Sequence, residues 1–213
     1  SLLVPIMSVF NETELYPSWM PRFERPFKVG IRGSEIHRVR NRFNQLLVSV
    51  VDMPMPLSTR ELAMDIVAVD DIEQTGAVFV KIVNASDDDP HLPKANPSTV
   101  RMSYDGGLLF RKCPPDHPVL AKTKNSDNAD RVLVCLQFFA DAHVAFVPRP
   151  VVNFGTRTVV GRMWSKMLEV AEEVRDGKRP LHAETIKQKQ DTYDWLDGRM
   201  KSMLKNYKKD EEE

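Results

Sequence analysis

Few residues of this chain have types and spacing suited to chemistry, and the clearest pair is Asp141 with His143. They lie two positions apart near the end of an apolar run, so a strand would point both to one face. A histidine–carboxylate pair that faces a cavity can act as general acid and base; the alternative is a hydrogen-bonded pair at a strand end. The sequence has no nucleophile elbow, His-Glu-x-x-His site, phosphate-binding glycine loop or dinucleotide fingerprint. It therefore predicts no catalytic residue and no cofactor.

A second cluster of reactive side chains lies in the polar segment 84–98. Asp87, Asp88, Asp89 and His91 occur there among three prolines. Carboxylates and histidine are metal ligands, but the segment lacks the glycine turn and the distal glutamate of a calcium loop. A solvated loop stiffened by proline is the other interpretation, and we predict no metal site.

The segment 22–42 is the one locally basic stretch, with seven basic side chains against Glu24 and Glu35. Phe23 and Phe27 lie among these basic residues. This pattern is typical of contact with an anionic membrane surface or a phosphate backbone, and a solvated face around a strand is the alternative. The basic residues are Arg22, Arg25, Lys28, Arg32, Arg38, Arg40 and Arg42.

Composition limits the remaining possibilities. The 213 residues are enough for one domain and an appendage, and the 30 basic and 30 acidic residues cancel, so we expect no nucleic-acid partner. No apolar run reaches the roughly 18–20 residues of a membrane span. Cys113 and Cys135 form no disulfide or metal pattern, which predicts free thiols in the cytoplasm or another reducing compartment. Residues 1–10 are apolar without the features of a signal peptide, and we expect an upstream segment to be missing.

The middle of the chain predicts an antiparallel sheet. Turn signals at residues 70–76 and at Asp105-Gly106-Gly107 predict two hairpins. The last strand is apolar on both sides, with Leu133, Cys135 and Phe139 on one side, so we expect both of its faces to be covered. The predicted strands are residues 46–51, 61–69, 77–83, 99–104, 108–112 and 132–147.

A long amphipathic helix follows the Pro148–Pro150 corner and ends at Asp176-Gly177. Its apolar residues recur at three- and four-residue steps, so they form one stripe that must be buried. The stripe consists of Val152, Thr156, Val159, Val160, Met163, Met167, Val170 and Val174.

A second amphipathic helix is predicted over residues 183–207, followed by a charged tail. We expect it to dock on Trp164 and Leu168, with Phe154 beyond them, and so to brace the first helix. The chain then divides into a domain of residues 1–176 and an appendage of residues 177–213.

Several segments, in this order, resemble START domains, the lipid-transfer domains related to steroidogenic acute regulatory protein. The resemblance covers roughly residues 12–174 and lacks the family's first helix and strands. The matching segments are Trp19-Met20-Pro21, Pro54–Glu61, Val100-Arg101-Met102, Gly106-Gly107 and Ala145–Pro148 leading into the long helix.

The resemblance implies an α+β helix-grip fold, in which a curved antiparallel sheet packs on a long C-terminal helix around a cavity for one lipid or sterol. It also implies that segments 84–98 and 113–130 form a mobile rim. Leu47 and Ile66 stand where sterol-binding members carry an acid–arginine pair. The expected ligand contacts are Leu47, Met64, Ile66, Val152, Thr156, Val159, Val160, Met163 and Met167.

Three functions follow from these observations. The first is non-enzymatic binding or transfer of a lipid or other hydrophobic small molecule, with peripheral contact of residues 22–42 with an anionic membrane. The second is a structural subunit with a filled pocket, which docks on a protein partner through residues 22–42 or the C-terminal helix. The third is an enzyme of the wider cyclase- and hydratase-like superfamily, based on Asp141 and His143.

Overall fold

A seven-stranded sheet forms the centre of the molecule, with the main strand order β1-β2-β3-β4-β6-β7. The computed structural model describes residues 2–23, 28–121, 131–144 and 147–205. All neighbours on this path pair antiparallel, as predicted, and the short β5 pairs in parallel with β3. The strands are β1 (Gly30–Asn41), β2 (Asn44–Asp52), β3 (Arg60–Asp71), β4 (Ala77–Asn84), β5 (Val100–Arg101), β6 (Ser103–Lys112) and β7 (Val132–Asp141).

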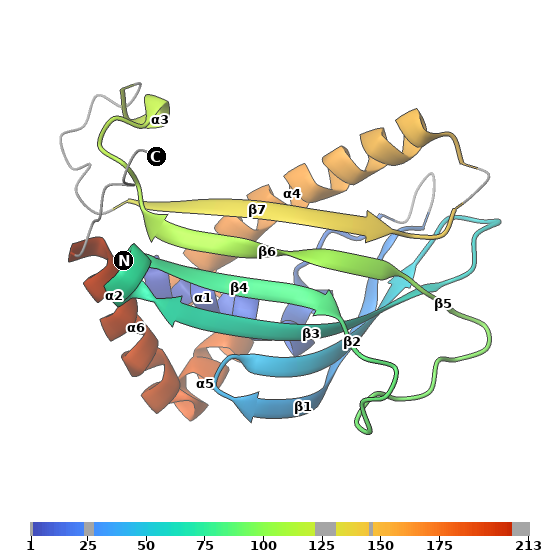
Figure 1. Ribbon diagram of the computed structural model, residues 1–213, viewed down its shortest axis with the longest axis horizontal. Coiled ribbons are helices and arrows are strands. Elements are labelled where there is room, and N and C mark those ends of the chain that lie inside the picture. The colour runs from blue at the N-terminus through green and yellow to red at the C-terminus, as the bar shows by residue number, and fades with distance from the viewer. Residues whose placement is uncertain (1, 24–27, 122–130, 145–146, 206–213) are drawn as a thin grey trace.

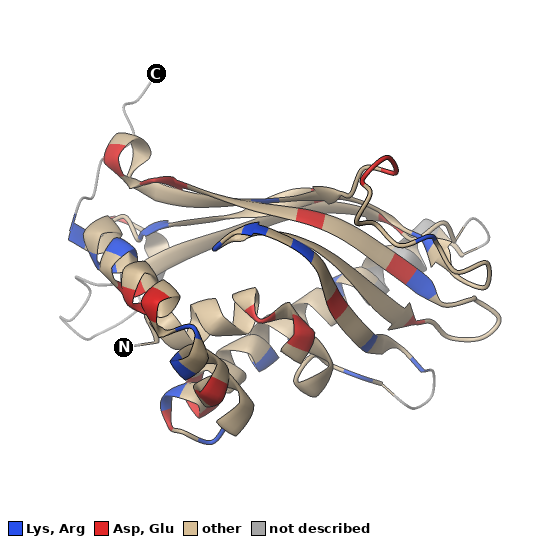
Figure 2. Cartoon of the chain, turned by 90° about the horizontal axis from the view of Figure 1, so that it is seen from below, with Lys and Arg blue, Asp and Glu red and all other residues tan. Residues whose placement is uncertain are grey.

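The large helices lie together on one face of the curved sheet (Figures 1 and 2). The predicted helix-grip architecture, a curved antiparallel sheet with C-terminal helices packed on it, is therefore confirmed. The 3-10 helix η1 (Thr13–Ser18) follows α1. The helices are α1 (Leu3–Asn11), α2 (Ile72–Thr75), α3 (Pro118–Ala121), α4 (Arg149–Arg175), α5 (Pro180–Gln188) and α6 (Gln190–Lys205).

Alternation along the strands determines which side chains face the helices. In β4, Val78 and Val80 point to the helical face, and their antiparallel partners are Phe110 and Leu108 of β6. Ile82 of β4 is paired with Ile66 of β3 in the same layer. The predicted strands β2, β3 and β4 thus place a continuous apolar surface under the helices.

The predicted hairpin at Asp105-Gly106-Gly107 is wrong, because β6 runs straight through these residues. An added Cβ at Gly106 would lie 2.5 Å from the Gln137 carbonyl oxygen, and one at Gly107 would lie 2.5 Å from the Val80 carbonyl oxygen. The glycines therefore allow the backbones of β7 and β4 to approach β6 closely.

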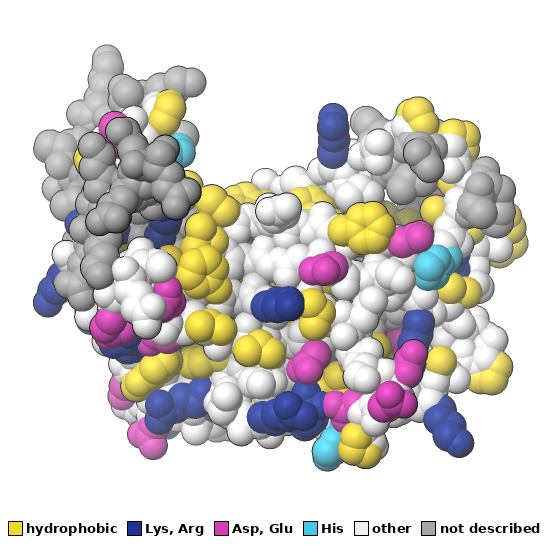
Figure 3. Space-filling model, viewed as in Figure 1, with side chains coloured by type: hydrophobic (Ala, Val, Ile, Leu, Met, Phe, Trp, Pro, Cys, Tyr) yellow, Lys and Arg dark blue, Asp and Glu magenta, His cyan; other side chains and the backbone are white. Residues whose placement is uncertain are grey.

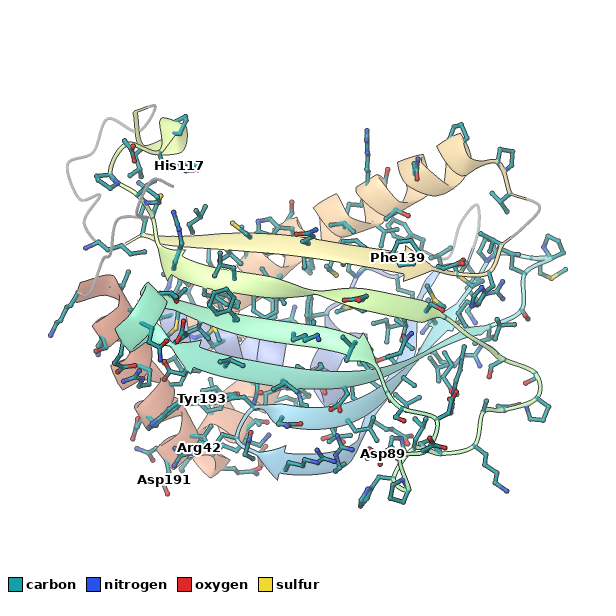
Figure 4. The ribbon with its side chains drawn as sticks, in the orientation of Figure 1. Arg42, Asp89, His117, Phe139, Asp191 and Tyr193 are labelled. Atoms are coloured by element: carbon teal, nitrogen blue, oxygen red, sulfur yellow. The ribbon has the colours of Figure 1, made fainter. Side chains whose placement is uncertain are left out.

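β7 is shorter and less covered than predicted. It ends at Asp141 rather than at residue 147, and residues 145–146 lie outside the described part. Its helical face packs on the core through Val132, Val134 and Leu136. Phe139 on the opposite face is 64% exposed, so the prediction that both faces are covered is wrong. Figure 3 shows this outer face, and Figure 4 labels Phe139 on β7 in the same view.

The long helix α4 has the predicted boundaries. Pro148 is its N-cap residue, and Gly177 follows its C-cap Asp176 with a positive φ of 71°. The buried part of its stripe, Met167, Val170 and Val174, packs together with Ala171 on α1 and Trp19. In the described part, α1 rather than the sheet is therefore the main support of α4.

The C-terminal segment forms two helices, because the predicted helix 183–207 is interrupted at Lys189. The buried residues of α6 pack on α1, α2, β4 and β6. Leu168 of α4 is 39% exposed, so docking of this segment on Leu168 is wrong. Trp164 and Ile186 of α5 do pack against the same apolar cluster.

Among the described residues, the opposite face of the sheet is covered by a loop at one place. Leu46, Val48 and Ala63 pack under Ala85 and Leu92 of the loop after β4. None of the described helices is long and apolar enough to cross a membrane.

Candidate functional site

A cavity of about 120 Å³ lies between the sheet, α1 and α6. Its walls are almost entirely apolar, and few of its lining side chains are polar or charged. The lining residues are Met7, Phe10, Asn11, Tyr16, Phe43, Gln45, Ile66, Ala68, Asp70, Val78, Val80, Ile82, Leu108, Phe110, Trp195, Leu196, Arg199 and Met200.

The wall formed by the sheet follows directly from strand alternation. Ile66 and Ala68 lie two positions apart in β3, so their side chains point to the same face of the sheet. Val80 of β4 pairs with Ala68 and lies in the same layer. Leu108 and Phe110 of β6 extend this layer, and the Phe110 ring meets Phe10 of α1 edge-to-face at 5.7 Å. The wall is thus assembled from four sequence-distant elements.

Helix α1 forms the base of the cavity, and its sequence explains why it can lie between two layers. Met7 packs toward the sheet and α6, whereas Val9 packs toward α4. Phe10 contacts both clusters. An apolar surface on both sides of one helix is typical of a helix buried between two layers.

Tyr16 brings a hydroxyl to the cavity wall. This hydroxyl donates to the Phe10 carbonyl oxygen at 2.7 Å. Burial, with smaller contributions from Tyr104 and Glu12, raises the pKa of Tyr16 well above its usual range. The hydroxyl is therefore neutral and its proton is committed to the backbone, which makes Tyr16 a wall residue rather than an acid or base.

Helix α6 closes the remaining side. Leu196 and Met200 are buried against the sheet, and the Trp195 ring at the rim stacks on Phe43 with centroids 5.7 Å apart. The guanidinium of Arg42 lies 5.3 Å from the centre of the Trp195 ring. These contacts connect α6 with the β1–β2 turn.

Arg199 connects α6 with Asp70 of β3 and Glu73 of α2. Its Nη2 donates to Asp70 Oδ1 at 2.8 Å and to Glu73 Oε2 at 2.8 Å. Hydrogen bonds from Arg199 lower the pKa values of both carboxyls and raise that of the guanidinium. All three groups are therefore charged at neutral pH.

A buried carboxylate holds the N-terminal end of α6. Glu12 is 5% exposed and accepts hydrogen bonds from Lys189 Nζ at 2.6 Å and from the Tyr193 hydroxyl. Burial, together with Glu12, raises the pKa of Tyr193 well above its usual range, so this hydroxyl stays protonated. Figure 4 shows Tyr193 and Asp191 on this helix; Tyr193 is buried and Asp191 is exposed.

Of the predicted ligand contacts on the sheet, Ile66 lines the cavity. Leu47 is fully buried and pairs with Met64, two positions from Ile66 along β3. Leu47 and Met64 therefore share the helical face of the sheet with the cavity but lie beyond its lining.

The predicted contacts on α4 lie apart from this cavity. Met167 is buried, and Met163 is half-buried against the same α1 cluster. Thr156 and Val159 are exposed, and Val160 is half-buried. The side chain of Val152 is outside the described part. Contact of these residues with a ligand stays a prediction.

Sequence reasoning missed the residues that α6 contributes to the cavity. Leu196 and Met200 belong to the amphipathic helix predicted over residues 183–207, but the prediction packs that helix on the long helix rather than on the sheet. Helical periodicity identifies a buried face without identifying what covers it. The available signal was the apolar character of residues 2–10 on all sides, which predicts that α1 lies between the sheet and another helix.

The third hypothesis, based on Asp141 and His143, fails in the structure. His143 Nδ1 lies 3.4 Å from Asp141 Oδ2, and the two side chains are 48% and 51% exposed. Asp141 ends β7 and His143 follows it, and neither lines the cavity. The His143 backbone N–H donates to Asp141 Oδ1 at 2.7 Å, so the pair is the hydrogen-bonded alternative at a strand end.

The acidic loop after β4 also has a structural explanation. Asp89 pairs with Arg38 and with His91, and Asp87 Oδ1 lies 3.7 Å from Arg101 Nη1. Within the described ranges, no group of three or more His, Cys, Asp or Glu side chains could hold a metal ion. Asp87 and Asp89 therefore pair with basic side chains of the protein.

The basic stretch 22–42 separates into different environments. Arg38 is buried between Asp65, at 2.9 Å, and Asp89. Lys28 and Arg32 instead surround the buried carboxylate of Asp52, with Lys28 Nζ 3.0 Å from Oδ2. Burial raises the pKa of Asp52, but hydrogen bonds from Arg32 and Lys28 outweigh it and lower the pKa overall.

Comparison with known proteins gives a fold and no closer relationship. No protein-family model matches the sequence, and no curated protein sequence matches it. Human STARD10 superposes with a TM-score of 0.57 at 13% identity, over 83% of this chain and 60% of that chain. This chain therefore spans about three-fifths of the length of STARD10.

Two proteins described as StAR-related lipid transfer proteins have similar structures. Human StAR-related lipid transfer protein 5 gives a TM-score of 0.52 at 14% identity, covering 80% of this chain and 71% of that one. A fragment of a STAR-related lipid transfer protein from Xanthomonas axonopodis gives 0.53 at 13% identity, covering 79% and 78%. The chain therefore has a START-like helix-grip fold.

Proposed function

We propose that this protein binds one hydrophobic molecule, a lipid or sterol-like compound, between the sheet and the helices, without catalysing a reaction on it. The observation that carries the proposal is the apolar cavity on the helical face of the sheet. Apolar pockets with a few polar side chains are typical ligand sites. Two proteins of similar fold are described as lipid transfer proteins.

The size of the cavity limits what can bind without rearrangement. Its volume of about 120 Å³ is below the roughly 300–1,000 Å³ of common ligand pockets. A cavity of about 150 Å³ accommodates a benzene molecule. A whole lipid would therefore need additional space along the sheet, towards Leu47, Met64 and the predicted contacts on α4.

Native mass spectrometry of protein purified from lipid-containing cells tests this proposal. Ala68→Phe fills the cavity, whereas Val69→Phe adds the same ring to the adjacent residue, which is 50% exposed on the opposite face. We expect a bound hydrophobic molecule in the wild type and in Val69→Phe, and its loss in Ala68→Phe. Retention of the molecule in Ala68→Phe would refute binding in this cavity.

A second candidate function, a structural subunit, is favoured by two observations. The cavity is small, and the outer face of the sheet exposes Val69, Phe79 and Phe139. A folded wild type that never carries a hydrophobic molecule in the same experiment would support this function instead of ligand binding.

We further propose that the end of the molecule near Asp52 contacts an anionic membrane. Arg22, Lys28 and Arg32 surround one carboxylate, which leaves a net positive charge. Met55, in the following loop, is 90% exposed and could insert among lipids.

Co-sedimentation with phosphatidylserine vesicles tests this contact, and binding to the vesicles should weaken in Lys28→Glu/Arg32→Glu. The exposed Arg40→Glu, as control, should bind as wild type; equal binding of both variants would contradict the assignment.

A further inference from the structure

We propose that α6 is a displaceable lid over the cavity and that the ion pairs of Arg199 hold this lid closed. The inference rests on the proposed function, because it concerns how a ligand reaches the same site. It is motivated by the position of α6, which contributes Trp195, Leu196, Arg199 and Met200 to the lining of the cavity.

The construction of the cavity allows it to open by movement of one element. Trp195, Leu196, Arg199 and Met200 are its only lining residues from α6 among those described, and the other walls belong to the sheet, α1 and η1. The strands are held to one another by continuous backbone ladders. Displacement of α6 therefore opens the site without breaking the sheet.

The two ends of α6 are attached differently. At the N-terminal end, the buried carboxylate of Glu12 accepts hydrogen bonds from the buried Tyr193 hydroxyl and from Lys189, which is 44% exposed. Further along the helix, Met203 and Leu204 are buried in the core, and the polar attachment is Arg199 with Asp70 and Glu73, whose side chains are 25%, 27% and 66% exposed. Exposed ion pairs break more easily than a buried, hydrogen-bonded carboxylate. In its polar contacts the N-terminal end is therefore held more firmly, and we assign it as the hinge.

A ligand can compensate for the apolar contacts that opening removes. Leu196 and Met200 cover Val78, Leu108 and Phe110 in the closed state. A hydrocarbon chain lying on the same surface would keep these residues away from water. Methionine adapts readily to different partners, and Met7, Met200 and Met203 all belong to this cluster. A cavity that is small while α6 is in place can therefore accommodate a larger hydrophobic molecule when α6 moves away.

Hydrogen exchange measured by mass spectrometry tests the lid directly. Arg199→Ala removes the pairs with Asp70 and Glu73. Lys201→Ala, on the same helix, removes an exposed pair with Asp197 and serves as the matched control. We expect peptides of α6 to exchange about tenfold faster in Arg199→Ala, since a paired guanidinium is lost. Peptides of β4 and β6, and all peptides of Lys201→Ala, should exchange as in the wild type.

Equal exchange of α6 in the wild type and Arg199→Ala would overturn the lid. Parallel acceleration of α6, β4 and β6 would also overturn it, because α6 would then open only with the whole domain. Glu73→Gln removes the charge of the carboxylate that pairs with Arg199. It keeps the arginine, and should accelerate exchange of α6 in the same direction by a smaller factor.

Uptake of cis-parinaric acid, followed by stopped-flow fluorescence, tests the lid and the proposed ligand binding separately. Faster uptake in Arg199→Ala than in the wild type and Lys201→Ala supports both the lid and ligand binding. Equal uptake rates, with equal exchange of α6, leave ligand binding intact and overturn the lid. Accelerated exchange of α6 without uptake by any variant supports the lid movement and contradicts lipid binding.

Discussion

Helices α4 and α6 carry similar apolar stripes but cover different surfaces. α4 has 27 residues and buries Met167 and Val170 against α1. α6 has 16 residues and buries Leu196 and Met200 against the sheet and the cavity. The shorter helix therefore encloses the site, because α1 already lies between the longer one and the sheet. The length of an amphipathic helix does not indicate which surface it covers.

The largest expected effects come from truncating the buried methionine of each helix. Met200 is 1% exposed and Met167 is 2% exposed. Each change to alanine should lower the free energy of unfolding by about 2–5 kcal/mol, measured by urea denaturation. Only Met200→Ala should also change the affinity for cis-parinaric acid, since only Met200 lines the cavity. An equal change of affinity in Met167→Ala would remove the distinction between the helices.

Acidification should release α6 through its ion pairs. Hydrogen bonds from Arg199 lower the pKa of Asp70 and of Glu73 in the closed state. Stabilisation from groups with lowered pKa values is complete above their ordinary values and is lost as the pH falls through the lowered ones. The stabilisation should therefore be lost below the ordinary pKa values, which are 4.5 for Glu73 and 3.8 for Asp70.

Arg199→Ala provides the control for this pH dependence, with the NMR signal of the Trp195 indole as the measurement. The wild type and the variant should differ at neutral pH, and the difference should shrink as the pH falls and the two carboxyls become protonated. A difference that persists undiminished on acidification would mean that Arg199 acts through contacts other than these carboxylates.

The smallest effect is expected on the outer flank of α4. Leu168 is 39% exposed, so Leu168→Ser should change the free energy of unfolding by no more than about 0.5 kcal/mol. The same change at the buried Leu196 of α6 should be far more destabilising. A large loss of stability from Leu168→Ser would mean that this flank is covered by another element after all.

Local patterns predicted most of the fold. Alternating apolar residues identified β2, β3 and β4, and the proline corner and Asp176-Gly177 identified both ends of α4. The order of motifs supported the START-like fold that the superpositions show. These features depend on residues close together in the chain, where propensity and periodicity are informative.

The failed predictions depend on contacts between distant segments. Gly106 and Gly107 have the sequence of a turn, but they serve the close approach of β7 and β4. Ile66 is a predicted ligand contact and lines the cavity, whereas the segment that forms α6 is predicted to pack on α4 and packs on the sheet instead. A helical stripe does not indicate which surface covers it. Here α1 lies between α4 and the sheet, and α6 packs on the sheet directly.

Photolabelling tests most directly whether α6 or α4 encloses the ligand. A fatty acid with a diazirine near the end of its chain would be bound, irradiated, and located by peptide mapping. We predict labelling of residues 78–82, 108–110 and 195–200, which line the cavity. Labelling confined to residues 156–163 of α4, with none on α6, would contradict the account.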